Sequence, residues 1–218
     1  VRWVNALAER GHEVYLVSNR GHEPKEDALN SRVKLYLMKH SGGKGYYLNA
    51  GELRKIAKRI NPDVINVHYA SGYGTLARKA RLPKYILSVW GSDVYDFPYE
   101  SRVKNHILKR NVRSASYLAS TSNCRAVQLK KVMQDEKLEI TITPFGVDLN
   151  KFDPKKYKEI EKEELIIGNI KALEEIYGIE EMILAFRDLK KELEQEHYSR
   201  KIKLLIYGSG SKKEQYED

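Results

Sequence analysis

Short apolar runs that alternate with helical patterns constrain the fold of this chain more than any other feature. The runs are rich in β-branched or aromatic residues and occupy 13–17, 33–38, 64–67, 85–89, 117–120 and 139–143. Between two of them, Leu53, Ile56, Ala57 and Ile60 recur at the spacing of one helix face. Strands that alternate with helices favour a mostly parallel sheet that is covered on both faces. The sequence therefore predicts an α/β fold with an open, Rossmann-like parallel sheet.

A second, shorter α/β unit follows. Residues 165–170 and 203–207 predict two strands, and 179–196 predict a long amphipathic helix between them. This βαβ unit is too short for a complete doubly wound sheet. We therefore predict a Rossmann-like domain over 1–150 and the beginning of a second, truncated one over 151–218. The chain starts inside a helix that would normally follow a strand, so we expect the first strand of domain 1 to be missing.

Charge is distributed unevenly between the two domains. The 218 residues include 39 Lys and Arg and 30 Asp and Glu, which gives a net charge of +9. Residues 1–150 contain 25 basic and 14 acidic residues, whereas 151–218 contain 14 and 16. The excess in the first domain suggests an anionic partner. Nucleic acid, a phosphorylated substrate and an acidic membrane surface all fit this charge.

Several classes of protein are excluded by composition. The apolar runs are far shorter than the roughly 20 residues that cross a bilayer. The first residues lack the apolar core of a signal peptide. Cys124 is the single cysteine, which excludes an intramolecular disulfide and a multi-cysteine zinc site, and we interpret it as a buried thiol. We expect a cytoplasmic protein.

Polar residues and glycines follow several of the predicted strands. Open parallel sheets bind ligands beyond the carboxyl ends of their strands. In the first domain this rule selects His68, Trp90, Gly91, Ser92, Asp93, Ser122, Asn123, Gly146 and Asp148. In the second domain it selects Lys171, Gly208 and Gly210. We therefore expect one crevice shared by the two sheets.

Most of these residues also have a structural interpretation. Asp93 could cap the helix that follows it, and His68 could bond only to backbone. Ser122 and Asn123 are good residues for a helix N-terminus. Trp90 could pack in the fold or stack on a sugar.

Six short segments, spread in order over nearly the whole chain, are each similar to a motif of one enzyme family. They are 2–14 (a first helix and second strand), 62–69 (PDVINVHY, like "PDVIHxH"), 90–94 (WGSDV, like "HGSD"), 143–148 (TPFGVD, like "PNGVD"), 177–179 (YGI) and 208–210 (GSG). In this order they resemble the group 1 (family 4) retaining glycosyltransferases, which have the GT-B fold.

The resemblance implies both a reaction and residue roles. A nucleoside-diphosphate sugar would bind mainly to the C-terminal domain, and the acceptor, a glycan or lipid-linked glycan, to the N-terminal domain. The sugar would be transferred with retention, and the family suggests cell-surface polysaccharide or glycolipid biosynthesis. The implied roles are catalysis for Asp93 and His68, donor-diphosphate binding for Lys171, Gly208 and Gly210, the acceptor cleft for Trp90, Gly91, Ser92, Ser122 and Asn123, and a hinge at Gly146 and Asp148.

The resemblance also implies that neither a cofactor nor a metal is needed. Basic side chains and a helix N-terminus would neutralise the departing diphosphate. The sequence agrees, because it contains no Asp-x-Asp motif.

This sequence departs from the family in its second domain. The family places an Arg and then a Lys there. Lys171 can replace the first cation, but Ile176 and Tyr177 occupy the second region. The family's paired glutamates (Glu-x7-Glu) and its glycine-rich loop before the first helix would lie beyond the two ends of this sequence. We therefore expect this fragment to be inactive by itself, and a degenerate GT-B module that binds glycans or scaffolds other enzymes is an alternative.

Basic residues surround Val103, Ile107 and Leu108. This pattern predicts an amphipathic helix within 99–113 that could lie on an anionic membrane surface. Peripheral attachment to the inner face of the membrane is therefore predicted. A nucleic-acid-binding protein is the less favoured alternative, because the chain has no recognisable reading motif and its aromatic residues do not interleave with the basic clusters.

Overall fold

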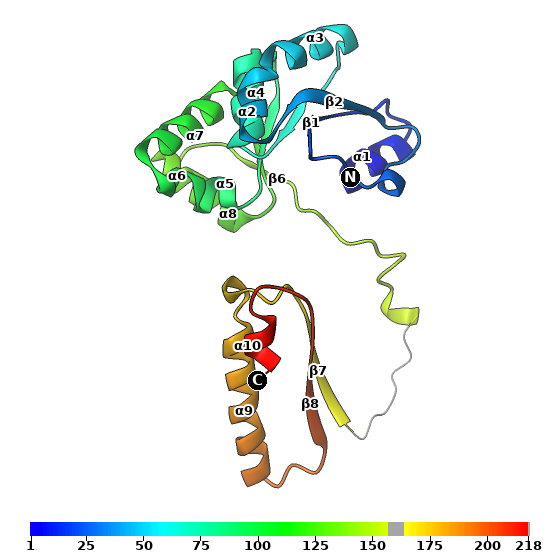
Figure 1. Cartoon of the computed structure of the whole chain (residues 1–218), viewed down its shortest axis with the longest axis vertical. Coiled ribbons are helices and arrows are strands. Elements are labelled where there is room, and N and C mark those ends of the chain that lie inside the picture. Colours follow the sequence, from blue (N-terminus) through cyan, green and yellow to red (C-terminus); the bar gives the residue numbers. More distant parts are fainter. Residues whose placement is uncertain (157–163, 218) are drawn as a thin grey trace. The chain divides into compact units, whose positions relative to one another are not determined.

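The computed structural model describes residues 1–156 and 164–217 and separates the chain into unit 1, Val1–Val147, and unit 2, Asp148–Asp218. Unit 1 is coloured blue to green in Figure 1, and unit 2 continues to red. The division lies between Gly146 and Asp148, the two residues predicted to form a hinge, and close to the predicted domain boundary at 150.

All described strands of unit 1 pair in parallel, as the sequence predicts. They are β1 (Tyr15–Arg20), β2 (Lys34–Ser41), β3 (Asn66–His68), β4 (Ile86–Val89), β5 (Tyr117–Ser120) and β6 (Thr141–Ile142). β1 pairs with β2, and a second sheet has the order β3-β4-β5-β6. The single predicted sheet is therefore divided between β1 and β3.

The helices of unit 1 come before, between and after its strands along the chain (Figure 1). They are α1 (Arg2–Glu9), α2 (Gly42–Leu48), α3 (Ala50–Ile60), α4 (Gly72–Ala80), α5 (Ser92–Tyr95), α6 (Phe97–Glu100), α7 (Arg102–Ser114) and α8 (Asn123–Met133). α1 is followed by Gly11, whose φ of +87° suits a residue without a side chain. α7 and α8 begin after serine N-caps, Ser101 and Ser122, whose hydroxyls accept from the backbone N–H three residues on.

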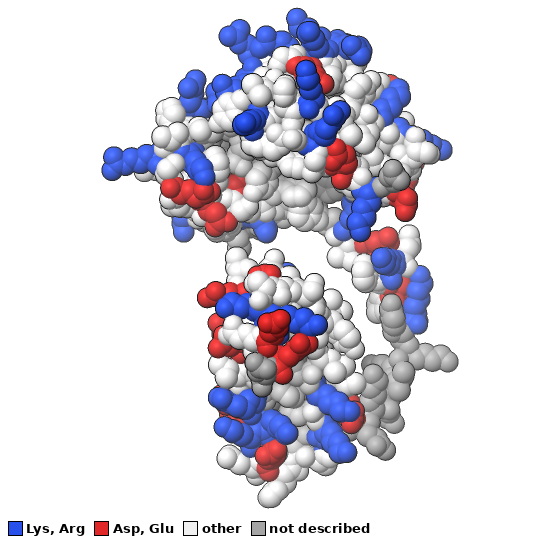
Figure 2. All heavy atoms as spheres, in the orientation of Figure 1, with Lys and Arg blue, Asp and Glu red and all other residues white. Residues whose placement is uncertain are grey.

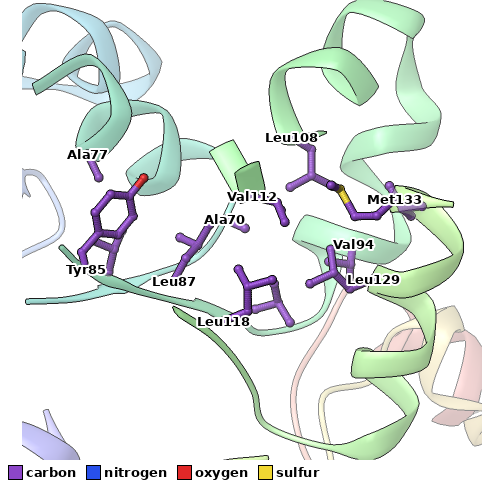
Figure 3. Packing of buried hydrophobic residues seen from close by; sticks show 13 residues of the cluster. Ala70, Ala77, Tyr85, Leu87, Val94, Leu108, Val112, Leu118, Leu129 and Met133 are labelled. Atoms are coloured by element: carbon purple, nitrogen blue, oxygen red, sulfur yellow. The ribbon is translucent and has the colours of Figure 1, made fainter. Parts of the chain in front are cut away.

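The main hydrophobic core lies between the β3–β6 sheet and the helices α4, α7 and α8. Figure 3 shows strand residues Leu87 and Leu118 pointing toward Val112 of α7 and Leu129 of α8. Leu87 and Leu129 are fully buried. This core holds the carboxyl ends of β3, β4 and β5 in fixed positions relative to one another.

The predicted amphipathic helix uses its apolar face inside the protein. Leu108 is fully buried in the core, whereas Val103 is 68% exposed. The prediction that Leu108 contributes to a lipid-binding face is therefore wrong, because that side of α7 packs on the sheet.

Unit 2 is the βαβ arrangement predicted from the sequence. β7 (Glu164–Ile170) pairs in parallel with β8 (Lys201–Tyr207), and α9 (Ile179–Gln195) connects them. Single turns of 3-10 helix occupy Pro154–Lys156 and Glu175–Tyr177, and α10 (Lys213–Glu217) follows β8. A further 3-10 turn, Glu26–Ala28, lies in unit 1.

The two units differ in surface charge. Figure 2 shows Lys and Arg spread over the visible face of unit 1, with fewer Asp and Glu, whereas both signs are mixed on unit 2. Among the described helices, none is both long enough and apolar enough to span a bilayer.

Candidate active site at the carboxyl ends of the strands

Asp93 ties together two loops at the carboxyl edge of the sheet. Its Oδ2 accepts a hydrogen bond from the N–H of Ala70, 2.8 Å away in the loop after β3. Its Oδ1 accepts from the N–H groups of Trp90 and Gly91 after β4, at 3.0 and 2.8 Å. The side chain is fully buried. Asp93 therefore holds the two loops together from within α5 (Ser92–Tyr95), a structural role other than the helix cap considered from the sequence, and both of its oxygens accept backbone N–H groups.

Four aromatic rings gather above this clamp. His68 at the end of β3 packs edge-on against Trp90, with 5.3 Å between the ring centroids. Trp3 of α1 lies 5.3 Å from His68, and Phe145 lies 5.0 Å from Trp90. Trp3 and Phe145 were not predicted as site residues. Phe145 belongs to the TPFGVD segment, and its place in that segment is the sequence feature that could have identified it as a site residue.

His68 is held in one protonation state. The indole Nε1–H of Trp90 donates to Nδ1 of His68 at 3.2 Å. Because Nδ1 accepts this bond, the proton of the neutral ring is on Nε2. Burial lowers the pKa of His68 from 6.5 to about 4. At neutral pH His68 therefore offers an Nε2–H donor and no positive charge.

A pocket of about 300 Å³ opens beside these rings. It is lined by Tyr46, His68, Tyr69, Tyr73 and Trp90. Of these residues, the sequence selected His68 and Trp90, and Tyr69 ends the PDVINVHY segment. Tyr46 of α2 and Tyr73 of α4 complete the site and were not predicted. Flat aromatic faces with polar edges suit a ring that is apolar on its faces and carries hydroxyls at its rim.

The tyrosines are fixed by polar contacts. The hydroxyl of Tyr73 lies 3.0 Å from the Oγ of Ser18 and accepts from the N–H of Asn19 at 3.1 Å, so it connects α4 to the end of β1. Tyr69 has a φ of +79°, which is unusual for a residue with a side chain. Its hydroxyl bonds to the Oγ of Ser92, and its N–H donates to the carbonyl of Ser88 at 2.9 Å. A strained residue held by its neighbours is typical of a functional loop.

The loop after β5 starts helix α8. Ser122 caps this helix, as its alternative interpretation proposed, and its Oγ accepts from NH1 of Arg125 at 3.0 Å. Asn123 is exposed in the first turn. Cys124 is exposed too, so the prediction of a buried thiol is wrong. Cys124 lies in the first turn of α8, where its side chain is exposed.

Gly146 follows the aromatic cluster. Its carbonyl accepts from NH1 of Arg2 at 3.3 Å, and its φ is +67°. Asp148, in unit 2, accepts from the N–H groups of Asn150 and Lys151. Both residues therefore shape the chain at the division between the units.

In unit 2, the predicted diphosphate residues lie together at the carboxyl ends of β7 and β8. The N–H of Lys171 donates to the carbonyl of Tyr207 at 3.1 Å. The ammonium of Lys171 lies 4.3 Å from the ring centroid of Tyr177, a cation–π contact. Tyr177 departs from the family pattern, whereas Lys171 is the cation that matches it. The ring of Tyr177 therefore holds Lys171 in place.

Gly208 and Gly210 are required by close packing. A Cβ at Gly208 would lie 1.9 Å from the carbonyl oxygen of Lys171, and one at Gly210 would lie 2.3 Å from that of Leu173. The carboxylate of Glu174 accepts from the N–H and hydroxyl of Ser211 at 2.8 and 2.6 Å, and these bonds lower its pKa. The loops after β7 and β8 therefore form one rigid edge, whose glycines have a structural reason independent of any ligand.

No group of three or more His, Cys, Asp or Glu side chains is arranged to hold a metal ion in the parts of the chain that the structure describes. In unit 1 the candidate site consists of aromatic rings, a neutral imidazole and backbone N–H groups. Unit 2, taken by itself, has a lysine edge at the carboxyl ends of β7 and β8.

Comparison with known proteins agrees with this geometry. The family model of glycosyl transferase 4-like proteins matches residues 1–122. TuaC of Bacillus subtilis (strain 168), named as a glycosyltransferase of teichuronic acid biosynthesis, is 30% identical over 97 residues, which are 43% of this chain and 24% of TuaC. A crystal structure of a glycosyltransferase from Rickettsia africae ESF-5 matches with a TM-score of 0.66 and 16% identity over 98% of this chain and 57% of that one.

The chain thus spans about a quarter of the curated relative and little more than half of the solved structure. The structural match carries the fold alone and confirms the Rossmann-like GT-B architecture. The family model covers more than half of the 218 residues, and the sequence match agrees with it. The predicted resemblance is confirmed: this chain belongs to the glycosyl transferase 4-like family, the group 1 glycosyltransferases of GT-B fold.

Proposed function

We propose that this chain provides the acceptor-binding domain and the start of the donor-binding domain of an enzyme that transfers a sugar, with retention, from a nucleoside-diphosphate sugar to a glycan or lipid-linked acceptor. The aromatic pocket beside the neutral His68, at the carboxyl edge of the β3–β6 sheet, is the observation that carries this proposal. It is the kind of surface that binds a sugar ring.

In this proposal the acceptor sugar stacks on the tyrosine and tryptophan faces of the pocket. The Nε2–H of His68 donates to an acceptor oxygen and orients it. Asp93 keeps the loops of Ala70 and Trp90 in register, so that His68 and Trp90 stay in contact. His68 then acts by positioning, because a neutral imidazole with its proton on Nε2 is an effective donor at neutral pH.

The donor diphosphate would bind at the lysine edge of unit 2. The ammonium of Lys171, held against Tyr177, would neutralise charge that develops on the leaving phosphate oxygen. The backbone of the turn at Gly208 and Gly210 would approach the same group. No metal ion or other cofactor enters this proposal.

The cellular setting is proposed from the relatives and the surface. TuaC is named for teichuronic acid biosynthesis, and for this chain we propose a role in cell-surface polysaccharide biosynthesis in the cytoplasm. Membrane attachment would use the exposed residues Tyr99 and Val103, which are 62% and 68% exposed, together with the neighbouring Arg102 and Arg110.

A catalytically degenerate module is the second candidate. The observation that favours it is Ile176, which is 84% exposed where the family places its second cation. Such a protein would bind a glycan in the aromatic pocket and release no nucleoside diphosphate.

One assay separates the two candidates. The complete polypeptide is incubated with a panel of nucleoside-diphosphate sugars and glycan acceptors, and free nucleoside diphosphate is measured. We expect release with at least one donor, and a decrease of about tenfold or more in kcat/KM for Lys171→Ala. Lys190→Ala, on the exposed side of α9, is the matched control and should retain the parent rate. Residues 1–218 alone are expected to show no turnover.

A further inference from the structure

Helix α8 begins with a cation where a carboxylate is normally found. Ser122 is its N-cap, and Arg125 is the third residue of the helix. In a capping box this position is Glu or Gln, which bonds back to the N-cap and favours the positive end of the helix dipole. The first turn of α8 contains no acidic residue. Arg125 therefore lies at the end of the helix where a positive charge is least favourable.

The guanidinium of Arg125 is partly buried and incompletely bonded. NH1 donates to the Oγ of Ser122 at 3.0 Å, but Nε is buried and has no hydrogen-bond partner among the described residues. Nor does any described carboxylate form an ion pair with Arg125. Asp93 lies in the neighbouring helix α5, but its oxygens accept three backbone N–H groups. A partly buried cation without a counter-ion is costly to the fold.

Arg125 lies at the same edge as the aromatic pocket. A Cβ built on Gly91 would come within 3.6 Å of Nε of Arg125, so the guanidinium lies beside the loop that follows β4. α5 and α8 lie side by side at this edge (Figure 1). Trp90, which lines the pocket, is the residue before Gly91. The unpaired charge is therefore next to the acceptor pocket.

A second polar group at the same helix start also lacks a partner. Thr121, the residue before the N-cap, is 7% exposed, and its buried Oγ1 makes no hydrogen bond within the described structure. Buried polar atoms are nearly always bonded, so each exception requires a reason. The backbone N–H groups at a helix start add further donors for an anion.

We propose that Arg125, Thr121 and the first turn of α8 form a binding site for an oxyanion, a phosphate or carboxylate group of a substrate. The inference rests on the proposed function only for the origin of that group. The group would be either the diphosphate of the sugar donor or an anionic substituent of the acceptor bound in the neighbouring pocket. An oxyanion would provide the counter-ion for Arg125 and an acceptor for both unbonded donors.

Binding is tested on the 218-residue chain by NMR titration with inorganic phosphate, at constant ionic strength maintained with chloride. We expect saturable shifts of the Asn123 and Cys124 amides and of the Arg125 Nε–H. Arg125→Gln should weaken binding about tenfold or more, and Thr121→Val severalfold. Lys131→Gln, with the same charge change at an exposed site in the last turn of α8, should leave binding unchanged.

Thermal unfolding excludes a purely structural role. Arg125→Glu restores a capping box, so it should raise the midpoint temperature of unfolding in phosphate-free buffer. Phosphate should raise this midpoint in the parent but not in Arg125→Glu. The proposal is overturned if phosphate gives no saturable shift, if Arg125→Gln and Lys131→Gln weaken binding equally, or if Arg125→Glu keeps the phosphate response.

The origin of the group is decided by competing ligands. Pyrophosphate that binds more tightly than a hexose monophosphate or glucuronate would assign the site to the donor, and the reverse order would assign it to the acceptor. These measurements need no turnover. A chain that binds none of these anions would overturn the site without affecting the nucleoside diphosphate assay, and an inactive enzyme would leave the anion titration valid.

Discussion

Nδ1 of His68 accepts a hydrogen bond from the indole nitrogen of Trp90 at 3.2 Å. This contact joins the ends of β3 and β4 and determines which nitrogen of the neutral imidazole carries the proton. In the family motif a histidine occupies the position of Trp90. Here an indole occupies that position and bonds to His68, the last residue of β3.

The burial of His68 predicts how stability depends on pH. Its folded pKa of about 4 is below the unfolded value of 6.5, so unfolding takes up a proton between these values. The contribution of His68 is therefore complete above pH 6.5 and is lost as the pH falls toward 4, up to about 3 kcal/mol. Urea unfolding gives the free energy of unfolding at pH 7 and at pH 4.5. Between these two pH values, His68→Gln should lose less of this free energy than the parent. An imidazole NMR titration with a midpoint near 6.5 would contradict this.

Replacement of Asp93 should destabilise unit 1 strongly. Asp93→Asn puts an amide nitrogen against backbone donors that now bond to a carboxylate, which should cost about 3 kcal/mol in free energy of unfolding. Asp96→Asn, an exposed change three residues on, should cost less than about 0.5 kcal/mol. Urea unfolding followed by circular dichroism measures both. Equal stability of the two variants would remove Asp93 from its clamp role.

Gly208 should not tolerate a side chain. Gly208→Ala places a Cβ against the carbonyl of Lys171, and the overpacking should cost about 3 kcal/mol. Gly168→Ala is the matched control, because a Cβ there meets no atom within 4 Å. Hydrogen exchange of the β7 and β8 amides should accelerate in the first variant and not in the second. Unchanged exchange in Gly208→Ala would show that the two loops are not packed as described.

Membrane attachment through α6 and α7 predicts selective binding to anionic vesicles. Val103→Glu introduces a negative charge beside Arg102 and should lower the partition coefficient about tenfold, because charge near such a surface contributes about 1 kcal/mol per residue and an apolar contact is lost as well. Val127→Glu, at an exposed valine of α8, is the control. Co-sedimentation with neutral and anionic vesicles measures this. A parent chain without preference for anionic vesicles would refute the attachment.

The strand pattern predicted the architecture well because parallel strands have short, continuous apolar runs. It also placed His68, Trp90 and Asp93 at one edge, since strand ends in a parallel sheet coincide. It could not separate a carboxylate that holds loops from one that binds a ligand, because both uses select Asp in the same turn. The outcome for Asp93 depends on Ala70, which belongs to the loop of another strand.

Other features depend on packing that periodicity does not describe. The apolar face of α7 has the same spacing whether it meets lipid or a sheet, so the burial of Leu108 was not predictable. Tyr46 and Tyr73 reach the pocket from helices without any local motif. Arg125 did have a signal, because Ser-x-x-Arg reverses the charge of a capping box.

The central claim, that His68 orients the acceptor, is tested most directly by the kinetics of nucleoside diphosphate release from the complete polypeptide. His68→Gln is compared with His106→Gln, which changes an exposed histidine of α7. We predict that the first variant folds like the parent at pH 7 and loses about tenfold in kcat/KM for the acceptor, whereas the second keeps the parent value. Equal acceptor kcat/KM in the parent and both variants would contradict the account.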